Sequence, residues 1–358
     1  GLGDVYKRQG YDLSSALELN RIYLDAFREE QIYRIDHFLG KETVQNILAL
    51  RFANSVFEPL WNRNYIDYVE ITAVENMGIG TRGGFYDGVG TLRDMVQNHL
   101  AQLLAVTAME PPAAFDASGF RNEVVKVYQS LTPLTGEDIR HSVVRGQYMA
   151  SEGRKGYREE EQVPALSRTE TYLAMRLELN NWRWGGVPFY IRTGKQMPTK
   201  VSEIVIHFKP APYSLFRCEG GTCPVPNRLV IRIQPNEGIV LRLGMKKPGE
   251  GFEVLPMDMD FSYAELGRLP TEDAYARLIE DCIAGDPTLF IRSDAVESGW
   301  RFFDPILKYW QDVPECPLYG YPAGSWGPLE ADSLVARQGA SWTNPCKNLT
   351  NTHLYCEL

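Results

Sequence analysis

Long apolar runs are missing from this sequence of 358 residues. No stretch approaches the roughly 20 consecutive apolar residues that a membrane-spanning helix needs. The N-terminal residues also lack the apolar core of a secretory signal peptide. We therefore expect a protein of the cytoplasm that has no membrane partner.

Cysteine is scarce and scattered. The six cysteines form no CxxC pair, and none stands at the histidine spacing of a zinc site. We interpret them as free thiols and expect no disulfide framework and no metal. They are Cys218, Cys223, Cys282, Cys316, Cys346 and Cys356.

Positive charge is also in deficit. The chain has 37 Lys and Arg against 46 Asp and Glu, which gives a net charge of −9. This balance works against nonspecific attraction to nucleic acid, so we expect no nucleic-acid partner. Recognition of a phosphate would require a local basic cluster. With 44% hydrophobic residues, the composition is otherwise that of an ordinary globular protein with one large domain or two.

Helical and strand periodicities occupy different parts of the chain. Helices come first, alternating patterns follow, and Gly285-Asp286-Pro287 separates two last helices. The strands have no helices between them, as parallel pairing would require, so the fold class is α+β with a large, mainly antiparallel sheet packed with helices. Residues 170–179 alternate like a half-buried strand. The predicted helices are Leu13 to Glu30, Lys41 to Phe57, Leu92 to Met109, Asp273 to Ala284 and Asp294 to Trp310, and the predicted strands are 68–74, 170–179, 187–192, 202–208, 228–234 and 238–244.

Residues 78–83 match the dinucleotide-binding pattern GxGxxG and follow a predicted strand, with Asp94 sixteen residues beyond the first glycine. In a true fingerprint the third glycine lies in the first turn of a helix that faces the pyrophosphate. Here GGFYDGVG is too rich in glycine to begin a helix at Gly83. We therefore predict a loop that leads into the next helix, rather than a nucleotide site.

Three groups of polar residues are candidates for a binding or catalytic site. In RIDHFLGKE, a helix beginning near His37 would place Lys41 one turn away, where the two could hold a phosphate monoester. The alternative is a charged helix start with ordinary surface pairs. In LRDMVQNH, His99 lies on the apolar stripe of its helix and is either a satisfied core residue or a general base oriented by a carboxylate. The nearby carboxylates are Asp36, Glu75 and Asp94.

The third group follows two strands. Lys195 and Lys200 come just after VPFYIR, where they are either solvated or presented to a cleft. Gln234 ends the strand VIRIQ and has an amide able to bridge the hydroxyls of a polyol. Taken singly, none of the three groups decides the function.

Taken together and in this order, six motifs closely resemble the glucose-6-phosphate dehydrogenase family. The resemblance runs almost without a gap from about Gly10 to Trp342. It is specific because several spaced motifs agree. They are RIDHFLGKETVQN, LRFANSVFEPLWN, TRGGFYDGVGTLRDMVQNHL, WGGVPFYIRTGK, IRIQPNE and YPAGSWGPLEAD.

The resemblance implies oxidation of D-glucose 6-phosphate at C1 to 6-phospho-D-glucono-1,5-lactone, with hydride transfer to NADP. It implies that His99 is the general base and that Asp36 orients it. The substrate-binding residues implied by the resemblance are His37 and Lys41 for the phosphate, Lys200 near the phosphate, Glu75 and Asp94 for sugar hydroxyls, and Lys195 and Gln234 for further sugar contacts. It also implies a homodimer or homotetramer that pairs through the large sheet.

The sequence departs from the family in places. Phe38 stands where the family commonly has tyrosine, which removes one hydrogen bond to the phosphate. The glycine-rich phosphate loop of the family's Rossmann domain has no counterpart, so we expect the coenzyme domain to be mostly missing and NADP reduction by this chain to be weak. Only Lys7 falls in register with a coenzyme-site lysine. The alternative function is a coenzyme-free sugar-phosphate-binding or oligomerisation module.

These comparisons predict a division of the chain into four parts. Residues 1–9 are an atypical start, and 10–36 are a remnant of the coenzyme-binding domain. Residues 37–342 form the catalytic α+β domain that binds glucose 6-phosphate. Residues 343–358 are an atypical tail.

Overall fold

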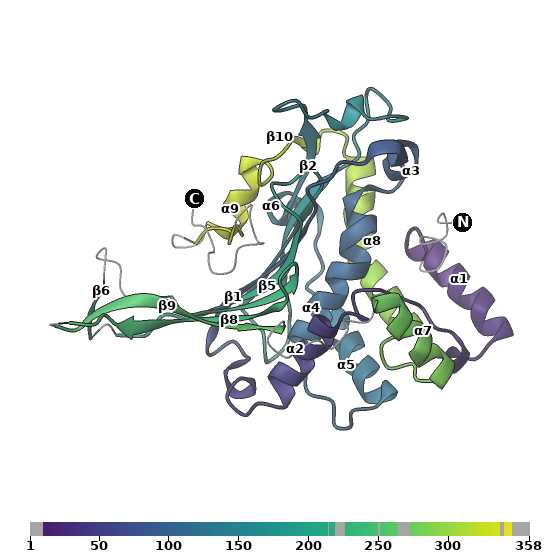
Figure 1. Cartoon of the computed structure of the whole chain (residues 1–358). Helices are drawn as coiled ribbons and strands as arrows, with labels where there is room; N and C mark the ends of the chain where they lie inside the picture. Colours follow the sequence, from purple (N-terminus) through teal and green to yellow (C-terminus); the bar gives the residue numbers. More distant parts are fainter. Residues whose placement is uncertain are drawn as a thin grey trace.

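A broad, curved sheet dominates the structure, with most helices on one side of it (Figure 1). The computed structural model describes residues 10–213, 215–218, 226–249, 251–263, 273–336 and 340–345. Lys7 and most of the predicted tail therefore lie outside the described residues. In this part of the chain the sheet has ten strands in the order β10-β2-β3-β4-β1-β5-β7-β8-β9-β6.

The sheet is mainly antiparallel, as predicted, with three parallel pairs. These pairs are β1 with β4, β10 with β2, and β6 with β9. Between β1 and β4 the chain passes through several helices and through β2 and β3, so the long connection that parallel pairing needs is present. The strands are β1 (Ile66–Val74), β2 (Val143–Met149), β3 (Tyr172–Glu178), β4 (Pro188–Gly194), β5 (Val201–Phe208), β6 (Arg217–Cys218), β7 (Arg228–Gln234), β8 (Gly238–Lys246), β9 (Glu253–Ser262) and β10 (Tyr319–Pro322).

All five predicted helices are present, with shorter bounds at several ends. The third is divided into a π-helical half and an α-helical half. Four helices, α3, α5, α6 and α9, and four strands, β2, β6, β9 and β10, were not predicted. The helices of at least four residues are α1 (Leu13–Ala26), α2 (Glu42–Phe52), α3 (Gly83–Asp87), η5 (Leu92–Leu100, the π-helix), α4 (Ala101–Ala108), α5 (Ala117–Gln129), α6 (Gly136–Ser142), α7 (Ala274–Ala284), α8 (Ser293–Asp312) and α9 (Asp332–Val335).

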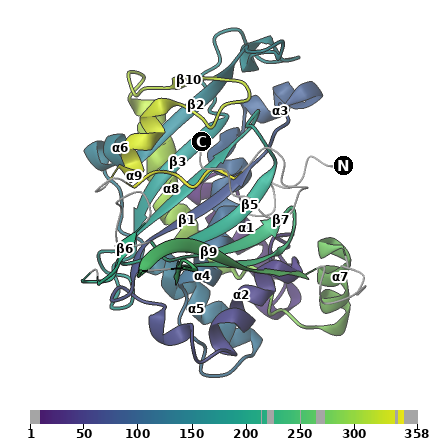
Figure 2. The same cartoon turned by 60° about the vertical axis from the view of Figure 1, so that its left-hand side comes forward.

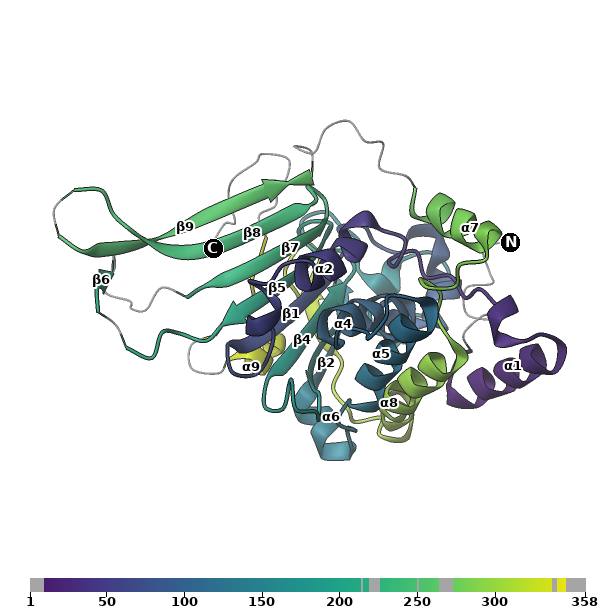
Figure 3. The same ribbon diagram turned by 90° about the horizontal axis from the view of Figure 1, so that it is seen from below.

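Both faces of the central strands are buried. The helices α2, α4, α5 and α8 lie on one face of the sheet (Figure 3), and Leu173 and Met175 of β3 belong to the main core. On the other face Tyr172 packs into a second, tyrosine-rich core covered by α9 and residues 340–345. The prediction that 170–179 is a half-buried strand was therefore wrong, because this second layer covers the face that we expected to meet water.

The outer strands extend beyond the helical layer. Strands β8 and β9 pair along nearly their whole lengths and project as a long arm (Figures 1 and 3), which comes toward the viewer in Figure 2. The arm leaves the apolar residues Met257 and Met259 exposed. None of the described helices is long and apolar enough to cross a membrane.

Candidate active site

The segment between α1 and α2 carries Asp36, His37 and Lys41, and a buried arginine fixes its beginning. The Arg34 guanidinium donates hydrogen bonds to Glu29 at 2.7 Å and to Asn20 Oδ1 at 3.1 Å. The backbone of Arg34 also forms a β-bridge with Ile291, just before α8. The segment is therefore attached both to the N-terminal helix and to the C-terminal part of the molecule.

The π-helix Leu92–Leu100 carries the other candidate residues, Asp94 and His99. In an α-helix, residues five apart point about 140° away from each other. A π-helix bonds residue i to i+5, which brings such residues toward one face. Asp94 and His99 consequently line the same cavity, a relation that a helical wheel drawn at α-helical spacing does not predict.

A glycine and a buried carboxylate fix the start of this helix. Glu170 Oε1 accepts a hydrogen bond from the Leu92 backbone N–H at 3.0 Å. Gly90, with a φ of +73°, lets the carboxylate approach, since a Cβ at this position would lie 2.5 Å from the same oxygen. This glycine is therefore required by both its backbone conformation and the close contact.

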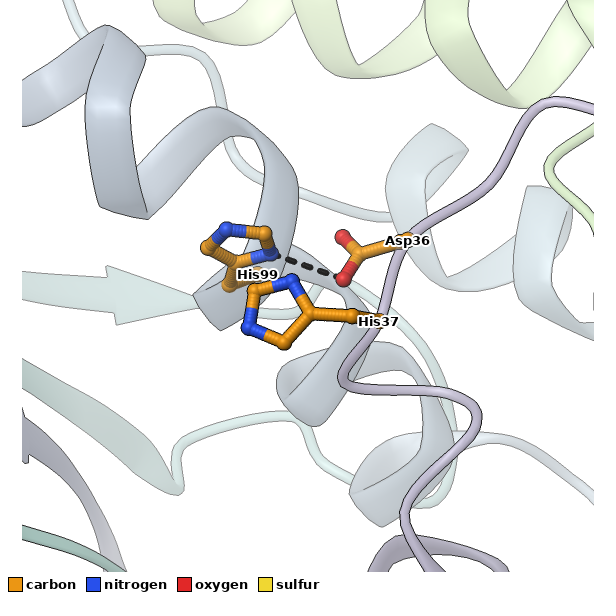
Figure 4. A group of neighbouring side chains, drawn as sticks. All are labelled: Asp36, His37 and His99. Atoms are coloured by element: carbon orange, nitrogen blue, oxygen red, sulfur yellow. Dashed lines mark hydrogen bonds and ion pairs between the residues drawn. The ribbon is translucent and has the colours of Figure 1, made fainter. Parts of the chain in front are cut away.

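His99 and Asp36 form a direct pair. His99 Nδ1 lies 2.7 Å from Asp36 Oδ1, and the same oxygen accepts a hydrogen bond from the Phe38 N–H at 2.9 Å (Figure 4). Burial opposes ionisation of Asp36, but the attraction of His99 and these two hydrogen bonds outweigh it and hold the pKa below its usual value. An ionised Asp36 accepts a hydrogen bond from His99 Nδ1, which leaves Nε2 as the ring nitrogen not engaged by the carboxylate.

Aromatic rings hold the His99 side chain on two sides. Phe38 stacks on it with ring centroids 4.7 Å apart and an interplanar angle of 17°, and His37 meets it edge-on at 4.5 Å. His37 in turn stacks against Tyr275 at the start of α7. Burial and the neighbouring His99 lower the pKa of His37 to about 4, so this imidazole is neutral at pH 7.

His99 lines a cavity of about 230 Å³, and its partner Asp36 lies behind it. One group of residues at its wall is cationic: Lys41 donates to Gln234 Oε1, while exposed Lys200 stands nearby and disfavours the charge on Lys41. Burial is the main reason why the pKa of Lys41 falls to about 8. The lining residues include all the predicted ones except Asp36, namely His37, Lys41, Glu75, Asp94, His99, Lys195, Lys200 and Gln234.

The second group at the wall is a lysine held between two carboxylates. Lys195 donates a hydrogen bond to Glu75 and lies 3.1 Å from Asp94 Oδ2. Burial alone would lower the pKa of Lys195, but the two carboxylates reverse the effect and raise it. The cavity thus offers both donors and acceptors at fixed positions.

Comparison with known proteins identifies the family. Residues 48–343 match the model described as glucose-6-phosphate dehydrogenase, C-terminal domain, and residues 5–46 match the model of its NAD binding domain. The glucose-6-phosphate 1-dehydrogenase of Aggregatibacter actinomycetemcomitans is 54% identical over 345 residues, which are 95% of this chain and 69% of that protein. The chain belongs to the glucose-6-phosphate dehydrogenase family.

Other members of the family show the same relation. The glucose-6-phosphate 1-dehydrogenase of Treponema pallidum is 49% identical and covers 99% of this chain, which matches 70% of that protein. A solved glucose-6-phosphate dehydrogenase in complex with glucose 6-phosphate has a TM-score of 0.86 at 36% identity. The match covers 94% of this chain and 68% of that one. The enzyme of Mycobacterium avium has a TM-score of 0.79 at 39% identity, covering 94% and 69%. The resemblance predicted from the motifs is therefore confirmed.

Two local predictions were wrong. His37 does not begin a helix: residues 37–40 form turns, and α2 begins at Glu42 with Lys41 as its N-cap. His37 and Lys41 still line one cavity, but the turns bring them there instead of helical spacing. A short helix, α3, does begin at Gly83, although a loop was predicted.

The glycine that begins this short helix has a packing role. A Cβ on Gly83 would lie 2.0 Å from the Glu161 carbonyl oxygen, so the glycine permits the close approach of the 160–163 loop. The helix has only five residues and continues directly from the 3₁₀ turn Gly80–Arg82. The described residues of the NAD binding domain match, 10–46, contain α1 and the segment leading to α2 and provide no glycine-rich phosphate cradle.

Besides Phe38, whose place beside the phosphate the resemblance implied, five cavity residues were not predicted from the sequence. They are Ala73, Val74, Arg82, Met95 and Ser202. Ser202 Oγ accepts a hydrogen bond from the Gln234 amide at 3.2 Å and so fixes how that amide points. Arg82 stands within the quoted motif TRGGFYDG, but nothing in its local pattern distinguishes it from a solvated arginine.

Proposed function

We propose that this cavity oxidises D-glucose 6-phosphate at C1 to 6-phospho-D-glucono-1,5-lactone, with NADP as the hydride acceptor. The observation that carries the proposal is the His99–Asp36 pair at 2.7 Å, whose histidine faces a cavity lined by cations and by hydroxyl acceptors. A general base beside a polyol-phosphate pocket is what oxidation of a sugar phosphate requires.

The phosphate is assigned to the part of the cavity near Lys41, His37 and Lys200. Lys41 supplies a charged donor, and phosphate binding releases its Nζ from Gln234. His37 is neutral at pH 7 and donates one N–H, and a bound dianion favours its protonation. Lys200 is exposed and adds a second ammonium at the rim.

The sugar ring is assigned to the part that contains Glu75, Asp94 and Lys195. Carboxylates accept hydrogen bonds from hydroxyls, and the ammonium donates to them. Because Lys195 is held by both carboxylates, the three groups keep a fixed relative geometry before substrate arrives. The Gln234 amide is assigned to the place where the ring part and the phosphate part of the cavity meet.

The proton of the C1 hydroxyl passes to His99 Nε2, the nitrogen not engaged by Asp36. As the C1–O single bond becomes a carbonyl, the Asp36 carboxylate stabilises the imidazolium that forms. The nicotinamide coenzyme, when bound, accepts the hydride that leaves C1. Phe38 and His37 keep the imidazole ring from turning away during this transfer.

Calorimetry and turnover on the same chain test the proposal. We expect wild type to bind glucose 6-phosphate, His37→Ala to bind it more weakly, and His99→Asn to bind it with nearly unchanged affinity. With NADP present, His99→Asn should reduce the rate of NADPH formation by roughly 10²- to 10⁴-fold. Parallel assays with NAD establish the coenzyme preference.

The outcomes separate the candidate functions. Binding without NADPH formation favours the alternative, a coenzyme-free sugar-phosphate-binding module. Absence of binding by both wild type and His37→Ala contradicts the enzyme and the module alike. Turnover that survives in His99→Asn contradicts the role proposed for the base.

We also propose that the chain self-associates through its large sheet, as a homodimer or homotetramer. The exposed Met257 and Met259 on the projecting arm support this proposal, since exposed apolar side chains on a sheet favour burial against a partner. Sedimentation of wild type and of Met257→Lys/Met259→Lys tests it. A monomer at all concentrations contradicts it.

A further inference from the structure

Asp36, His37 and His99 lie together in the arrangement of a metal-binding site (Figure 4). One ligand atom from each residue lies within 4.8 Å of the other two, and this is the only such group among the described residues. We propose that this cluster binds a divalent transition-metal cation, with Zn²⁺ as the reference ion, and that the ion competes with substrate. The competition rests on the proposed function, but the binding of the metal does not.

A carboxylate oxygen that lacks a hydrogen-bond partner supports the proposal independently. Asp36 is 2% exposed, and its Oδ2 is buried without a hydrogen-bond partner in the described structure. Such a buried oxygen keeps unsatisfied lone pairs, which a cation would satisfy after a rotation of the carboxylate, since Figure 4 shows the bonded Oδ1 as the oxygen nearer to the two rings. The partly exposed rings of His37 and His99 separate the carboxylate from the cavity, so a cation entering from there meets nitrogen first.

The distances fit zinc after a limited adjustment. Tetrahedral Zn²⁺ with ligands about 2.0 to 2.2 Å away holds its ligand atoms roughly 3.4 Å from one another. The widest pair of ligand atoms must therefore close by at most about 1.4 Å, to which a rotation of the His37 ring can contribute. The hydrogen-bonded atoms His99 Nδ1 and Asp36 Oδ1, 2.7 Å apart, would instead separate by about 0.7 Å as the shared proton leaves. The fourth position then faces the cavity and is open to water, an arrangement typical of exchangeable sites.

The ligand set selects the class of ion. Two imidazoles and one carboxylate suit Zn²⁺, Co²⁺, Ni²⁺ and Cu²⁺, whereas Mg²⁺ and Ca²⁺ require six or more oxygen ligands. Lys41 opposes any cation here, but its ammonium is directed to Gln234 and lies 4.5 Å from the Phe38 ring centroid. The attraction of Asp36 and the two nitrogens acts against this repulsion.

Two other histidine–carboxylate pairs provide internal controls. His207 lies 2.7 Å from Glu70, and His141 lies 3.9 Å from Glu137. Neither belongs to a described group of three possible ligands. A pair that lacks the third ligand binds zinc weakly. We therefore expect zinc to bind at the proposed site and not at these two pairs, because only the proposed site has a third ligand, His37.

Occupation of the site blocks substrate in two ways. The ion engages the imidazole that takes the proton of the sugar hydroxyl, and it uses His37, which is assigned to the phosphate. Zinc inhibition should consequently be competitive with glucose 6-phosphate. Saturating glucose 6-phosphate should also weaken zinc binding measured directly.

The experiment measures Zn²⁺ binding to the chain by calorimetry without substrate or coenzyme. We expect one site in wild type that weakens at least about tenfold in His37→Gln and in Asp36→Asn. His37→Cys should retain the site because a thiolate also binds zinc, and His141→Gln should leave it unchanged. Mg²⁺ should give no corresponding site.

The possible results decide the proposal. Equal zinc binding by wild type and His37→Gln, both folded by circular dichroism, overturns it, since ions bound elsewhere contribute equally to the two proteins. If both His37→Gln and His37→Cys lose the site, His37 acts on the fold and the assignment is also overturned. Zinc binding without glucose 6-phosphate binding supports the metal site and contradicts the proposed enzyme, so the two failures are distinguishable.

Discussion

The affinity for glucose 6-phosphate should fall as pH rises from 7 to 9, because Lys41 loses its proton. Burial, together with Lys200, lowers the pKa of Lys41 to about 8. About nine tenths of Lys41 is then charged at pH 7 and about one tenth at pH 9, so a dianion that requires the ammonium should bind about tenfold more weakly at pH 9. That factor corresponds to about 1.4 kcal/mol.

Neither the phosphate of the ligand nor His37 changes its protonation state appreciably between pH 7 and 9. A phosphate monoester has its second pKa near 6, so the ligand remains a dianion between pH 7 and 9. His37 has a pKa of about 4 and is neutral throughout the range in the absence of ligand. The dissociation constant from calorimetry at four or five pH values gives the curve directly.

A matched variant isolates the lysine. Lys41→Arg keeps its charge at pH 9, because guanidinium is effectively always protonated, and its affinity should be nearly flat over the range. Lys200→Gln removes a neighbouring charge but retains the titrating ammonium, so its curve should still fall. A flat curve for wild type, or equal slopes for wild type and Lys41→Arg, would refute the assignment of Lys41 to the phosphate.

Three further predictions follow from single contacts. Phe38→Tyr should tighten binding of glucose 6-phosphate by up to roughly 1 kcal/mol, because the new hydroxyl donates a hydrogen bond to the phosphate. Unchanged or weaker binding in calorimetry would show that this hydrogen bond does not form. Binding of the dianion at pH 7 should take up more protons in wild type than in His37→Gln, because Lys41 accounts for only about 0.1 proton and His37 for the rest. Calorimetry in buffers of different ionisation enthalpy measures the uptake, and equal uptake by the two proteins contradicts the place of His37 beside the phosphate. Gly90→Ala should lower the free energy of unfolding by more than about 1 kcal/mol, because of its φ of +73° and the contact with Glu170; a denaturant midpoint equal to wild type would show that the segment relaxes freely.

The fold class could be predicted from the spacing of apolar residues and from the order of helices and strands along the chain, as two strands illustrate. The alternation in 68–74 and 228–234 correctly predicted β1 and β7, because a strand that belongs to one sheet keeps its two-residue period regardless of its partners. The same alternation could not reveal that Tyr172 on β3 lies in a second core, since that depends on α9 and residues 340–345, which are more than 150 positions away in the chain. The parallel pairing of β1 with β4 is equally nonlocal.

The sequence identified which residues belong to the site but not how they are arranged. His99 and Asp94 were selected on residue type and by resemblance, yet their shared orientation depends on the π-helix. Helix periodicity assumes α-helical spacing, so this geometry has no signal in the pattern. The neutral state of His37 also depends on burial and on the neighbouring His99, which come from other parts of the chain.

The proposed base and its partner come from different parts of the family pattern. Asp36 lies in the match to the NAD binding domain, 5–46, and His99 in the match to the C-terminal domain, 48–343. Their 2.7 Å contact therefore joins the two parts, and its length depends on how the segment from Arg34 is held. Arg34 is bound to Glu29, to Asn20 and to the backbone of Ile291, so any movement of α1 that strains these bonds also moves the carboxylate. We therefore predict that the buried arginine positions the Asp36 carboxylate for its contact with His99, although it lies outside the cavity lining.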